Sequence, residues 1–479
     1  MKRSLRFWFW LLVVGLSGIF LLPELIRGGM YYDGMAYSLI SRNMAYGYGS
    51  FWEPMFTPVI WPVFYEHPPA GFGLQSLFFR LLGDGWLVER FFALVVFIVS
   101  LLLLRKLWLK SNPLPATTAA TSLDWLPVFL WILAPSVGSV YARNMLEGIV
   151  TVFTIAAILL MLRALQDKKG GLLFVAAGVL CTGAFLTKGF TGLFPWAVPF
   201  LWWLTYRDTR WTKMLLRSVL LIASTLAFLG LLLIDDTAFH SMGQYLDQQV
   251  FRAIRGDREL AVYGRFHILI KMAGEFFYML LPLALMLVLV PNDQWRSCWR
   301  GIDKKVVLFW VLVGASASLP VMISLKQFSY YVVPAYPYFA MALAMVIKSF
   351  WEQLQSVDGA AGPWRKIVRP LAILVLLSAV VASVSSIGKS RDTALLADVE
   401  AIGKYQARDG TFYNCLDSLE GDHRLQAYLF RYHYQTVTRS DTAHFLLLEH
   451  GKTTCELIDL AAWTEVERLH YFTLLRRKN

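Results

Sequence analysis

The chain has 479 residues, of which 57% are hydrophobic and 16% are charged. A soluble globular protein carries about a quarter of its residues as charges, so this composition excludes that class. The formal net charge of +12 would suggest a nucleic-acid partner in a soluble protein. In a chain this apolar the charge has to be interpreted by its position along the sequence, and we expect no nucleic-acid partner.

Apolar runs near the length of about 20 residues that crosses a bilayer recur from Phe7 to Ile387. They predict about eleven membrane-spanning helices, at 7–25, 86–109, 123–142, 146–166, 171–187, 190–206, 214–234, 267–291, 306–324, 328–348 and 368–388. The predicted fold class is an all-α polytopic membrane protein that carries a small α/β domain at its C-terminal end.

Lysine and arginine gather in alternate connections between these spans. Examples are Arg105 and Lys106, Arg207 and Arg210, and Lys304. Because basic connections stay in the cytoplasm, the pattern predicts a cytoplasmic N-terminus in a bacterial-type inner (plasma) membrane. The opposite orientation would place every basic cluster outside.

Three long segments then lie on the outer side. They are a first loop at 26–85, a second loop at 235–266, and a tail at 389–479 whose composition becomes much more polar. Loops this long between short connections are usually functional or separate domains. We therefore expect a transmembrane domain at 1–388 and a small extracytoplasmic α/β domain at 389–479.

Two of the four cysteines, Cys415 and Cys455, fall in the outer tail. An oxidising compartment would allow them to form a disulfide, whereas two free buried thiols are the alternative. Spacing alone leaves both open.

The first outer loop holds the most informative residues. Asp33 follows the first span within Tyr31-Tyr32-Asp33-Gly34. A partly desolvated carboxylate at the membrane face can accept a proton from a hydroxyl nucleophile, so Asp33 is a candidate general base. The alternative is a helix N-cap, in which Asp33 accepts from the amides of the following turn.

Further along the same loop stands Tyr65-Glu66-His67-Pro68-Pro69, followed by a short amphipathic segment. The two prolines favour a rigid entry into that helix. Glu66 and His67 can both ligate a divalent metal, which is a candidate cofactor. The alternative is a polar interfacial turn.

The order of these motifs resembles the GT-C superfamily of glycosyltransferases, and within it the protein O-mannosyltransferase and lipid A aminoarabinose transferase group. The residues that carry the resemblance are the acid after the first span, Glu66-His67-Pro68-Pro69, Gly83 to Phe92 at the second span, Tyr141-Ala142-Arg143-Asn144, Leu186-Thr187-Lys188-Gly189, and Ser329 to Pro337. The resemblance covers about residues 1–350.

The resemblance implies that one sugar is transferred from a polyprenyl-phosphate donor to a lipid, glycan or protein acceptor on the outer face. It also implies that Asp33 is the catalytic base, although Gly34 stands where the family usually has a second acid. In the aminoarabinose transferases the matching Glu helps to hold a metal with a His from a later outer loop. His240 and His267 fall in that region.

Cations on the outer side are not explained by topology. Because a glycosyl phosphate leaves as an anion, we expect Lys188, Arg252, Arg255 and Lys326 to bind the donor phosphate. We expect Tyr330, Tyr331, Arg90 and Arg143 to line the substrate pocket. The alternatives are helix-end lysines that extend to the headgroups, an ion pair of Arg143 with Glu147, and a solvated basic face around Arg252.

Two other functions remain open from the sequence. A transporter or flippase for a lipid-linked glycan would also need many spans and outer cations, although the sequence shows no two-fold hydropathy repeat. A non-catalytic member of the family would explain the incomplete acid pair. Chemistry with nucleotide sugars on the cytoplasmic side is disfavoured, because the inner loops carry few carboxylates; Asp208 is the main exception.

Overall fold

The computed structural model describes residues 2–111, 123–166, 170–255, 264, 266–323, 326–358, 361–414, 421–440, 443–451 and 459–478. Cys415 and Cys455 lie outside the described residues, so their disulfide stays a prediction. The chain forms two compact units. Unit 1 comprises 1–25, 66–71 and 90–385, and unit 2 comprises 26–65, 72–89 and 386–479.

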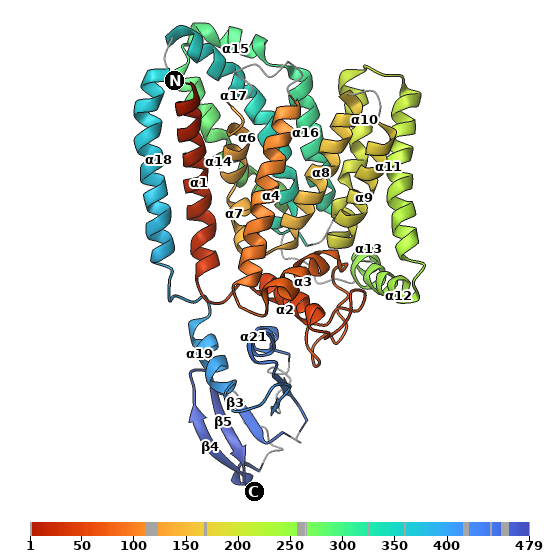
Figure 1. Ribbon diagram of the computed structural model, residues 1–479, viewed down its shortest axis with the longest axis vertical. Coiled ribbons are helices and arrows are strands. Elements are labelled where there is room, and N and C mark those ends of the chain that lie inside the picture. Colours follow the sequence, from red (N-terminus) through yellow and green to blue (C-terminus); the bar gives the residue numbers. More distant parts are fainter. Residues whose placement is uncertain are drawn as a thin grey trace. The chain divides into compact units, whose positions relative to one another are not determined.

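Unit 1 is a helical bundle (Figure 1). Its α-helices are α1 (Lys2–Ile26), α4 (Val88–Ser111), α6 (Leu126–Ile132), α7 (Pro135–Ala142), α8 (Leu146–Gln166), α9 (Gly171–Lys188), α10 (Val198–Tyr206), α11 (Trp211–Leu232), α12 (Asp236–Tyr245), α13 (Arg252–Arg255), α14 (His267–Leu289), α15 (Trp295–Gly301), α16 (Lys304–Ser318), α17 (Tyr336–Asp358) and α18 (Ala361–Val384). Short 3-10 turns are η1 (Gly189–Gly192), η2 (Phe194–Ala197), η4 (Asn292–Gln294), η5 (Leu319–Ile323) and η6 (Ser329–Ala335), and Leu246–Phe251 is a π-helix.

Within the described residues, nine helices are long and apolar enough to cross a membrane. They coincide with nine of the expected spans, and the chain is a multi-pass membrane protein. The two remaining expected spans, 123–142 and 190–206, are not single long helices. Pro135 begins α7 directly after α6 has ended, and Pro195 and Pro199 lie in η2 and at the start of α10. A proline lacks the backbone donor that continues a helix, which is why both segments are interrupted.

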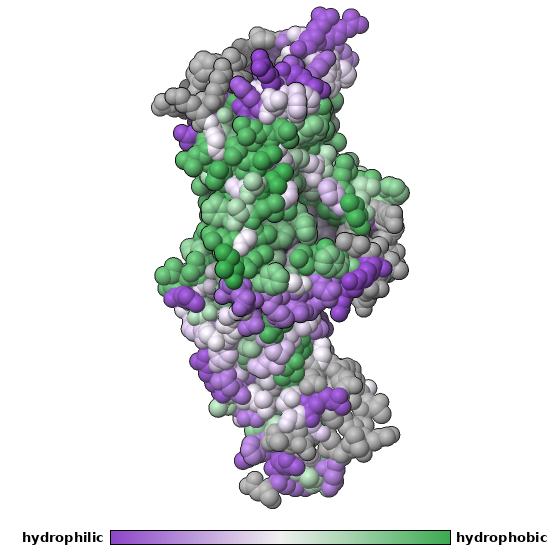
Figure 2. Space-filling model, turned by 90° about the vertical axis from the view of Figure 1, so that its right-hand side faces the viewer, coloured by the Kyte–Doolittle hydropathy of each residue, from purple (hydrophilic) through white to green (hydrophobic). Residues whose placement is uncertain are grey.

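The surface of the bundle is largely hydrophobic (Figure 2). Exposed apolar side chains are frequent on α11, α14 and α18, for example Leu216, Phe277 and Val381. A soluble protein would bury side chains of this kind. Their exposure follows from a lipid environment, where apolar side chains face acyl chains.

Two basic residues of the bundle, Arg6 and Arg105, share a buried carboxylate as their partner. The side chain of Asp124 is 0% exposed and accepts from Arg6 Nε at 2.9 Å and from Arg105 Nε at 2.7 Å. Trp10 Nε1 donates to the same carboxylate at 3.2 Å. This carboxylate therefore ties the start of α1 to the end of α4.

Unit 2 combines part of the first loop with the C-terminal tail. Its elements are α2 (Tyr32–Ala45), α3 (Ala70–Leu82), α19 (Thr393–Ile402), β1 (Thr411–Tyr413), α21 (His423–His433), β2 (Thr436–Thr438), β3 (Phe445–Glu449), η7 (Leu460–Ala462), β4 (Trp463–Arg468) and β5 (Phe472–Arg477). The strands form one sheet in the order β2-β1-β3-β5-β4, in which β1 is parallel to β2 and β3 and the other pairs are antiparallel. The predicted small α/β domain is confirmed.

A buried ionic cluster joins α21 to the first loop within unit 2. The side chain of Arg431 is 1% exposed, and its guanidinium donates to Asp84 at 2.7 Å and to Glu89 at 3.0 Å. Burial lowers the pKa of Arg431, but the two carboxylates outweigh this and raise it above its usual value. Arg42 of α2 donates to the carbonyl of Phe430 and lies over the Tyr434 ring at 3.8 Å.

Arg42 is itself fully buried. Burial, followed by repulsion from Arg431, lowers the pKa of Arg42 to about 10. Two buried guanidinium groups this close are tolerated because Asp84 and Glu89 supply the opposite charges. The helix α2 is therefore held by contacts with α21 that lie almost 400 positions away in the chain.

Candidate active site

Asp33 lies in the first turn of α2, in unit 2. The N-cap of this helix is Tyr31, which makes no side-chain capping bond, so Asp33 is not the capping residue. An acidic side chain in the first turn still interacts favourably with the helix dipole. Asp33 is partly buried rather than fully exposed. Its role as a general base stays a prediction.

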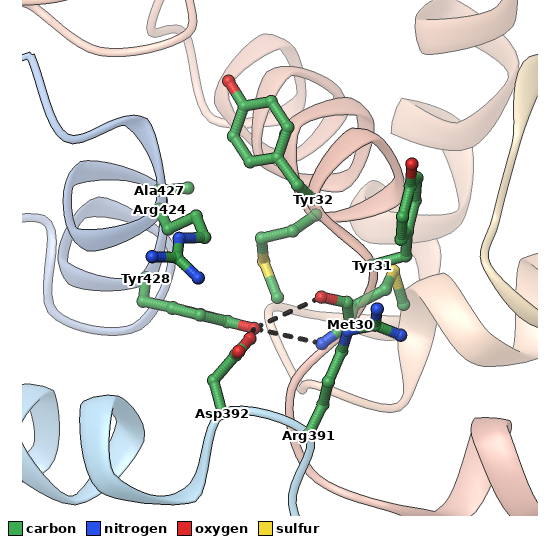
Figure 3. Close-up of a pocket in the computed structure, with 9 residues that line it drawn as sticks. Met30, Tyr31, Tyr32, Arg391, Asp392, Arg424, Ala427 and Tyr428 are labelled. Atoms are coloured by element: carbon green, nitrogen blue, oxygen red, sulfur yellow. Dashed lines mark hydrogen bonds between the residues drawn. The ribbon is translucent and has the colours of Figure 1, made fainter.

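The segment that leads into α2 borders a cavity of about 160 Å³ (Figure 3). Met30, Tyr31 and Tyr32 line it from the first loop, and Arg391, Asp392, Arg424 and Tyr428 line it from the tail. The Tyr428 hydroxyl lies 2.7 Å from Asp392 Oδ2 and accepts from the Met30 amide at 3.2 Å. The pocket thus offers phenol and guanidinium groups that can donate to a hydroxyl or an anionic group. One of its lining residues, Tyr32, directly precedes Asp33 in the chain.

In unit 1, the structure brings Lys188 together with both tyrosines of the late motif. The ammonium lies 5.6 Å from the ring centre of Tyr330 and 5.1 Å from that of Tyr331. It also forms an ion pair with Glu147, and the two side chains are 9% and 2% exposed. A lysine that reached outward along a helix end would be exposed, so the geometry disfavours that alternative for Lys188.

The turn after Lys188 depends on a glycine. Gly189 has a φ of 65°, and a Cβ at this position would lie 1.8 Å from the hydroxyl of Tyr245. Only glycine adopts this conformation without strain and leaves room for the tyrosine. Tyr245 of α12 therefore packs closely against the end of α9, next to Lys188.

The remaining predicted cations are dispersed over unit 1. Arg252 and Arg255 are exposed on the short helix α13, and Arg255 lies 4.0 Å from Asp247. Exposed pairs of this kind contribute little to stability. Arg90 is buried near the start of α4, Arg143 is the C-cap residue of α7, and Lys326 precedes η6. Their assignment to donor and substrate binding stays a prediction.

Glu66 and His67 belong to unit 1 and lie just before α3. Glu66 is exposed and His67 is partly buried. A catalytic zinc site uses three protein ligands. Over the described ranges, no group of three or more His, Cys, Asp and Glu side chains could hold a metal. The assignment of Glu66 and His67 to a metal site therefore stays a prediction, and no step of the proposed reaction passes through a metal.

Sequence reasoning missed one feature in each unit. Glu147 was considered only as a neighbour of Arg143 one helical turn away, whereas the structure pairs it with Lys188, 41 positions along the chain. Arg391 and Arg424 gave no signal beyond the polar composition of the tail. The ion pair of Glu147 with Lys188 and the position of the two arginines beside the first loop depend on long-range packing. A pattern within one segment cannot show either.

Comparison with known proteins assigns the fold. Residues 66–234 match the family model of dolichyl-phosphate-mannose-protein mannosyltransferase. The crystal structure of ArnT from Cupriavidus metallidurans bound to undecaprenyl phosphate matches 98% of this chain and 97% of its own, with a TM-score of 0.63 and 14% identity. The chain has the fold of the GT-C glycosyltransferases.

Other solved structures agree with this fold. The apo structure of the same ArnT has a TM-score of 0.63 at 16% identity, with 95% of both chains covered. An oligosaccharyltransferase from Archaeoglobus fulgidus, tethered to an acceptor peptide, has a TM-score of 0.50 at 12% identity, with 90% of this chain and 64% of its own covered. No curated protein sequence matches significantly. The predicted resemblance and the predicted GT-C-like fold are confirmed.

Proposed function

We propose that this protein transfers a single sugar from a polyprenyl-phosphate donor to a lipid, glycan or protein acceptor on the outer face of a bacterial-type plasma membrane. The observation that carries the proposal is the buried Lys188, which Glu147 holds beneath Tyr330 and Tyr331. A cation in this setting suits a phosphate that is attached to a lipid. The similar ArnT was crystallised with undecaprenyl phosphate, and the similar oligosaccharyltransferase with an acceptor peptide, which supports a lipid donor and a separate acceptor.

The reaction is a nucleophilic displacement at the anomeric carbon. Asp33 takes the proton from the acceptor hydroxyl, whose oxygen forms the new glycosidic bond while the bond from the anomeric carbon to the phosphate oxygen breaks. The polyprenyl phosphate leaves with the bonding electrons, and Lys188 stabilises the charge that develops on it. A single displacement of this kind inverts the anomeric centre.

The decisive assay supplies purified protein with a radiolabelled polyprenyl-phosphate sugar and candidate acceptors. Release of free polyprenyl phosphate in step with labelled acceptor supports the proposal. Movement of intact donor across a vesicle membrane without release would instead identify a flippase.

Replacing Lys188 by Gln is expected to weaken donor binding by about 10- to 150-fold, since a hydrogen bond to a charged group contributes about 1.5–3 kcal/mol. Acceptor binding should change much less. Separate titrations of donor and acceptor against the detergent-solubilised protein would measure both. Equal losses for the two ligands would contradict a phosphate-specific role.

Two further variants test the role of Lys188 and that of Arg255, a second predicted phosphate ligand. Glu147→Gln keeps the lysine but removes the carboxylate that orients it, so a smaller loss of donor affinity is expected. Arg255→Ala removes an exposed cation of the same unit, and the proposal assigns it a direct phosphate contact with a loss similar to that of Lys188. Unchanged donor affinity in Arg255→Ala would return this arginine to a solvated face.

Transfer activity is expected to survive exhaustive chelation if Glu66 orients the first loop instead of holding a metal; over the described ranges no group of three or more His, Cys, Asp and Glu side chains could hold one. Glu66→Gln should still impair the enzyme if Glu66 orients the first loop through hydrogen bonds. Turnover with and without chelator, in wild type and in Glu66→Gln, decides the point. Inactivation by chelator that disappears in the Glu66→Gln background would establish a shared metal site.

A further inference from the structure

A second cavity lies within unit 1, among the ends of four helices that meet at one end of the bundle. It has a volume of about 470 Å³ and is lined by the last residues of α4 and α8, by α10 and the residue Asp208 beyond it, and by the start of α16. Two membrane-length helices end here, at Ser111 and Gln166, and a third begins at Lys304. The ends of spanning helices lie at the level of lipid headgroups, so the cavity occupies that level.

Four aromatic side chains form a continuous wall of this cavity. Trp202 packs on Tyr206 with ring centres 4.1 Å apart and contacts Phe309 edge-on at 5.4 Å. Phe309 in turn contacts Trp310 at 4.9 Å. Tryptophan and tyrosine concentrate at membrane interfaces because their rings are apolar and their polar atoms still reach hydrogen-bond partners.

Opposite charges line the same cavity. The anionic side chains are Asp208 and Asp303, and the cationic one is Lys110. Asp208 accepts from Trp202 Nε1 at 3.1 Å, and Asp303 caps α16 by accepting from the Lys305 amide at 3.0 Å. Each of these bonds uses one oxygen atom, and a carboxylate has acceptor sites to spare. The cavity therefore presents acceptors for a cation beside a donor for an anion.

One buried indole in the wall makes no hydrogen bond within the described part of the chain. The indole of Trp310 is 1% exposed, and its Nε1 has no hydrogen-bond partner among the side chains and backbone that the structure describes. A buried donor that is left unsatisfied costs about 1–3 kcal/mol.

We propose that this cavity binds the headgroup of a phospholipid that carries a primary ammonium beside its phosphate, as phosphatidylethanolamine does. The ammonium donates to Asp208 and Asp303, Lys110 contacts the phosphate, and the aromatic wall packs against the glycerol region. Among the side chains that line the cavity, an anionic headgroup would meet two carboxylates and one lysine, which disfavours it. A choline headgroup has the charge but lacks the N–H donors that the carboxylates accept.

The test uses the intact protein and measures lipid retention, so its outcome is independent of transferase activity. The protein is incubated with an equimolar mixture of phosphatidylethanolamine, phosphatidylcholine and phosphatidylglycerol, and the retained lipids are counted by native mass spectrometry. We expect phosphatidylethanolamine to be enriched about tenfold or more over each of the others, which corresponds to about 1.4 kcal/mol. Equal retention of the three lipids, or a preference for phosphatidylglycerol, would overturn the proposal.

The variants are Asp208→Asn and Asp303→Asn, alone and combined. Asparagine still caps a helix, so the second substitution removes the charge but preserves the start of α16. The double variant should lose the enrichment, whereas Asp293→Asn, an exposed carboxylate of η4 that does not line the cavity, should retain it. Enrichment that persists in a folded double variant would also overturn the proposal.

A measurement on the wild type covers the case in which the double variant does not fold. Soluble glycerophosphoethanolamine should displace retained phosphatidylethanolamine at concentrations at which glycerophosphocholine does not. Displacement by both compounds at the same concentration would show that the ammonium hydrogens are not recognised and would refute the assignment.

Discussion

Turnover by the Asp33→Asn variant is expected to fall by at least about 100-fold, because loss of a positioned general base removes a factor of about 10²–10⁴ in rate. Asparagine is nearly isosteric with aspartate but cannot accept the acceptor's proton. The Km values for donor and acceptor should change little, since the base acts mainly in the transition state. Steady-state kinetics on the folded variant would measure both parameters.

A matched substitution, Asp236→Asn, separates the loss of a catalytic base from the loss of helix stability. Asp236 occupies the first turn of α12, as Asp33 occupies that of α2. Both substitutions remove a favourable interaction with a helix dipole of about 0.3–1 kcal/mol. Only Asp33→Asn should abolish transfer, and turnover close to that of the wild type would reduce Asp33 to this helix-stabilising role.

Loss of Arg431 is expected to destabilise unit 2 by about 3–5 kcal/mol, which is the usual effect of breaking a buried ion pair by removing one partner. Arg431→Met keeps an apolar side chain of fair length in place but removes the guanidinium from Asp84 and from the fully buried Glu89. Pulse proteolysis in urea, with cleavage sites assigned to residues 386–478, would measure the change in the free energy of unfolding.

Two further variants test whether the unpaired carboxylates cause the loss of stability in Arg431→Met. Arg431→Met combined with Glu89→Gln should be more stable than Arg431→Met alone, since no carboxylate at position 89 then loses its guanidinium. Arg468→Ala, at an exposed position in β4, should change the free energy by no more than about 0.5 kcal/mol. A similar loss in Arg431→Met and Arg468→Ala would show that the buried charges are not what holds α21.

Local pattern was sufficient for the membrane helices. Each of the nine long helices is an apolar run with few charges, and every run of this kind has to satisfy its backbone hydrogen bonds internally in lipid. The same rule wrongly predicted one long helix for each of the segments 123–142 and 190–206. There the apolar composition is that of a span, but Pro135, Pro195 and Pro199 divide the backbone into short helices and turns.

For the candidate site, the sequence supplied residue types and the structure supplied their partners. Lys188, Tyr330 and Tyr331 were selected from separate motifs, and the structure places the Lys188 ammonium 5.6 Å and 5.1 Å from the two ring centres. Glu147 could not be selected, because a glutamate four residues from an arginine predicts a local pair. The contact with Lys188 depends on how α8 packs against α9.

The sequence by itself determined that the chain is a multi-pass membrane protein with the GT-C order of motifs, because apolar run length and motif order are local properties. Only the tertiary structure decided that part of the first loop and the C-terminal tail form one compact unit. The physical reason is that the buried guanidinium groups of Arg42 and Arg431 meet their partners far along the chain. Arg431 finds Asp84 and Glu89 more than 340 positions away, and α2 is held where Arg42 meets the carbonyl of Phe430.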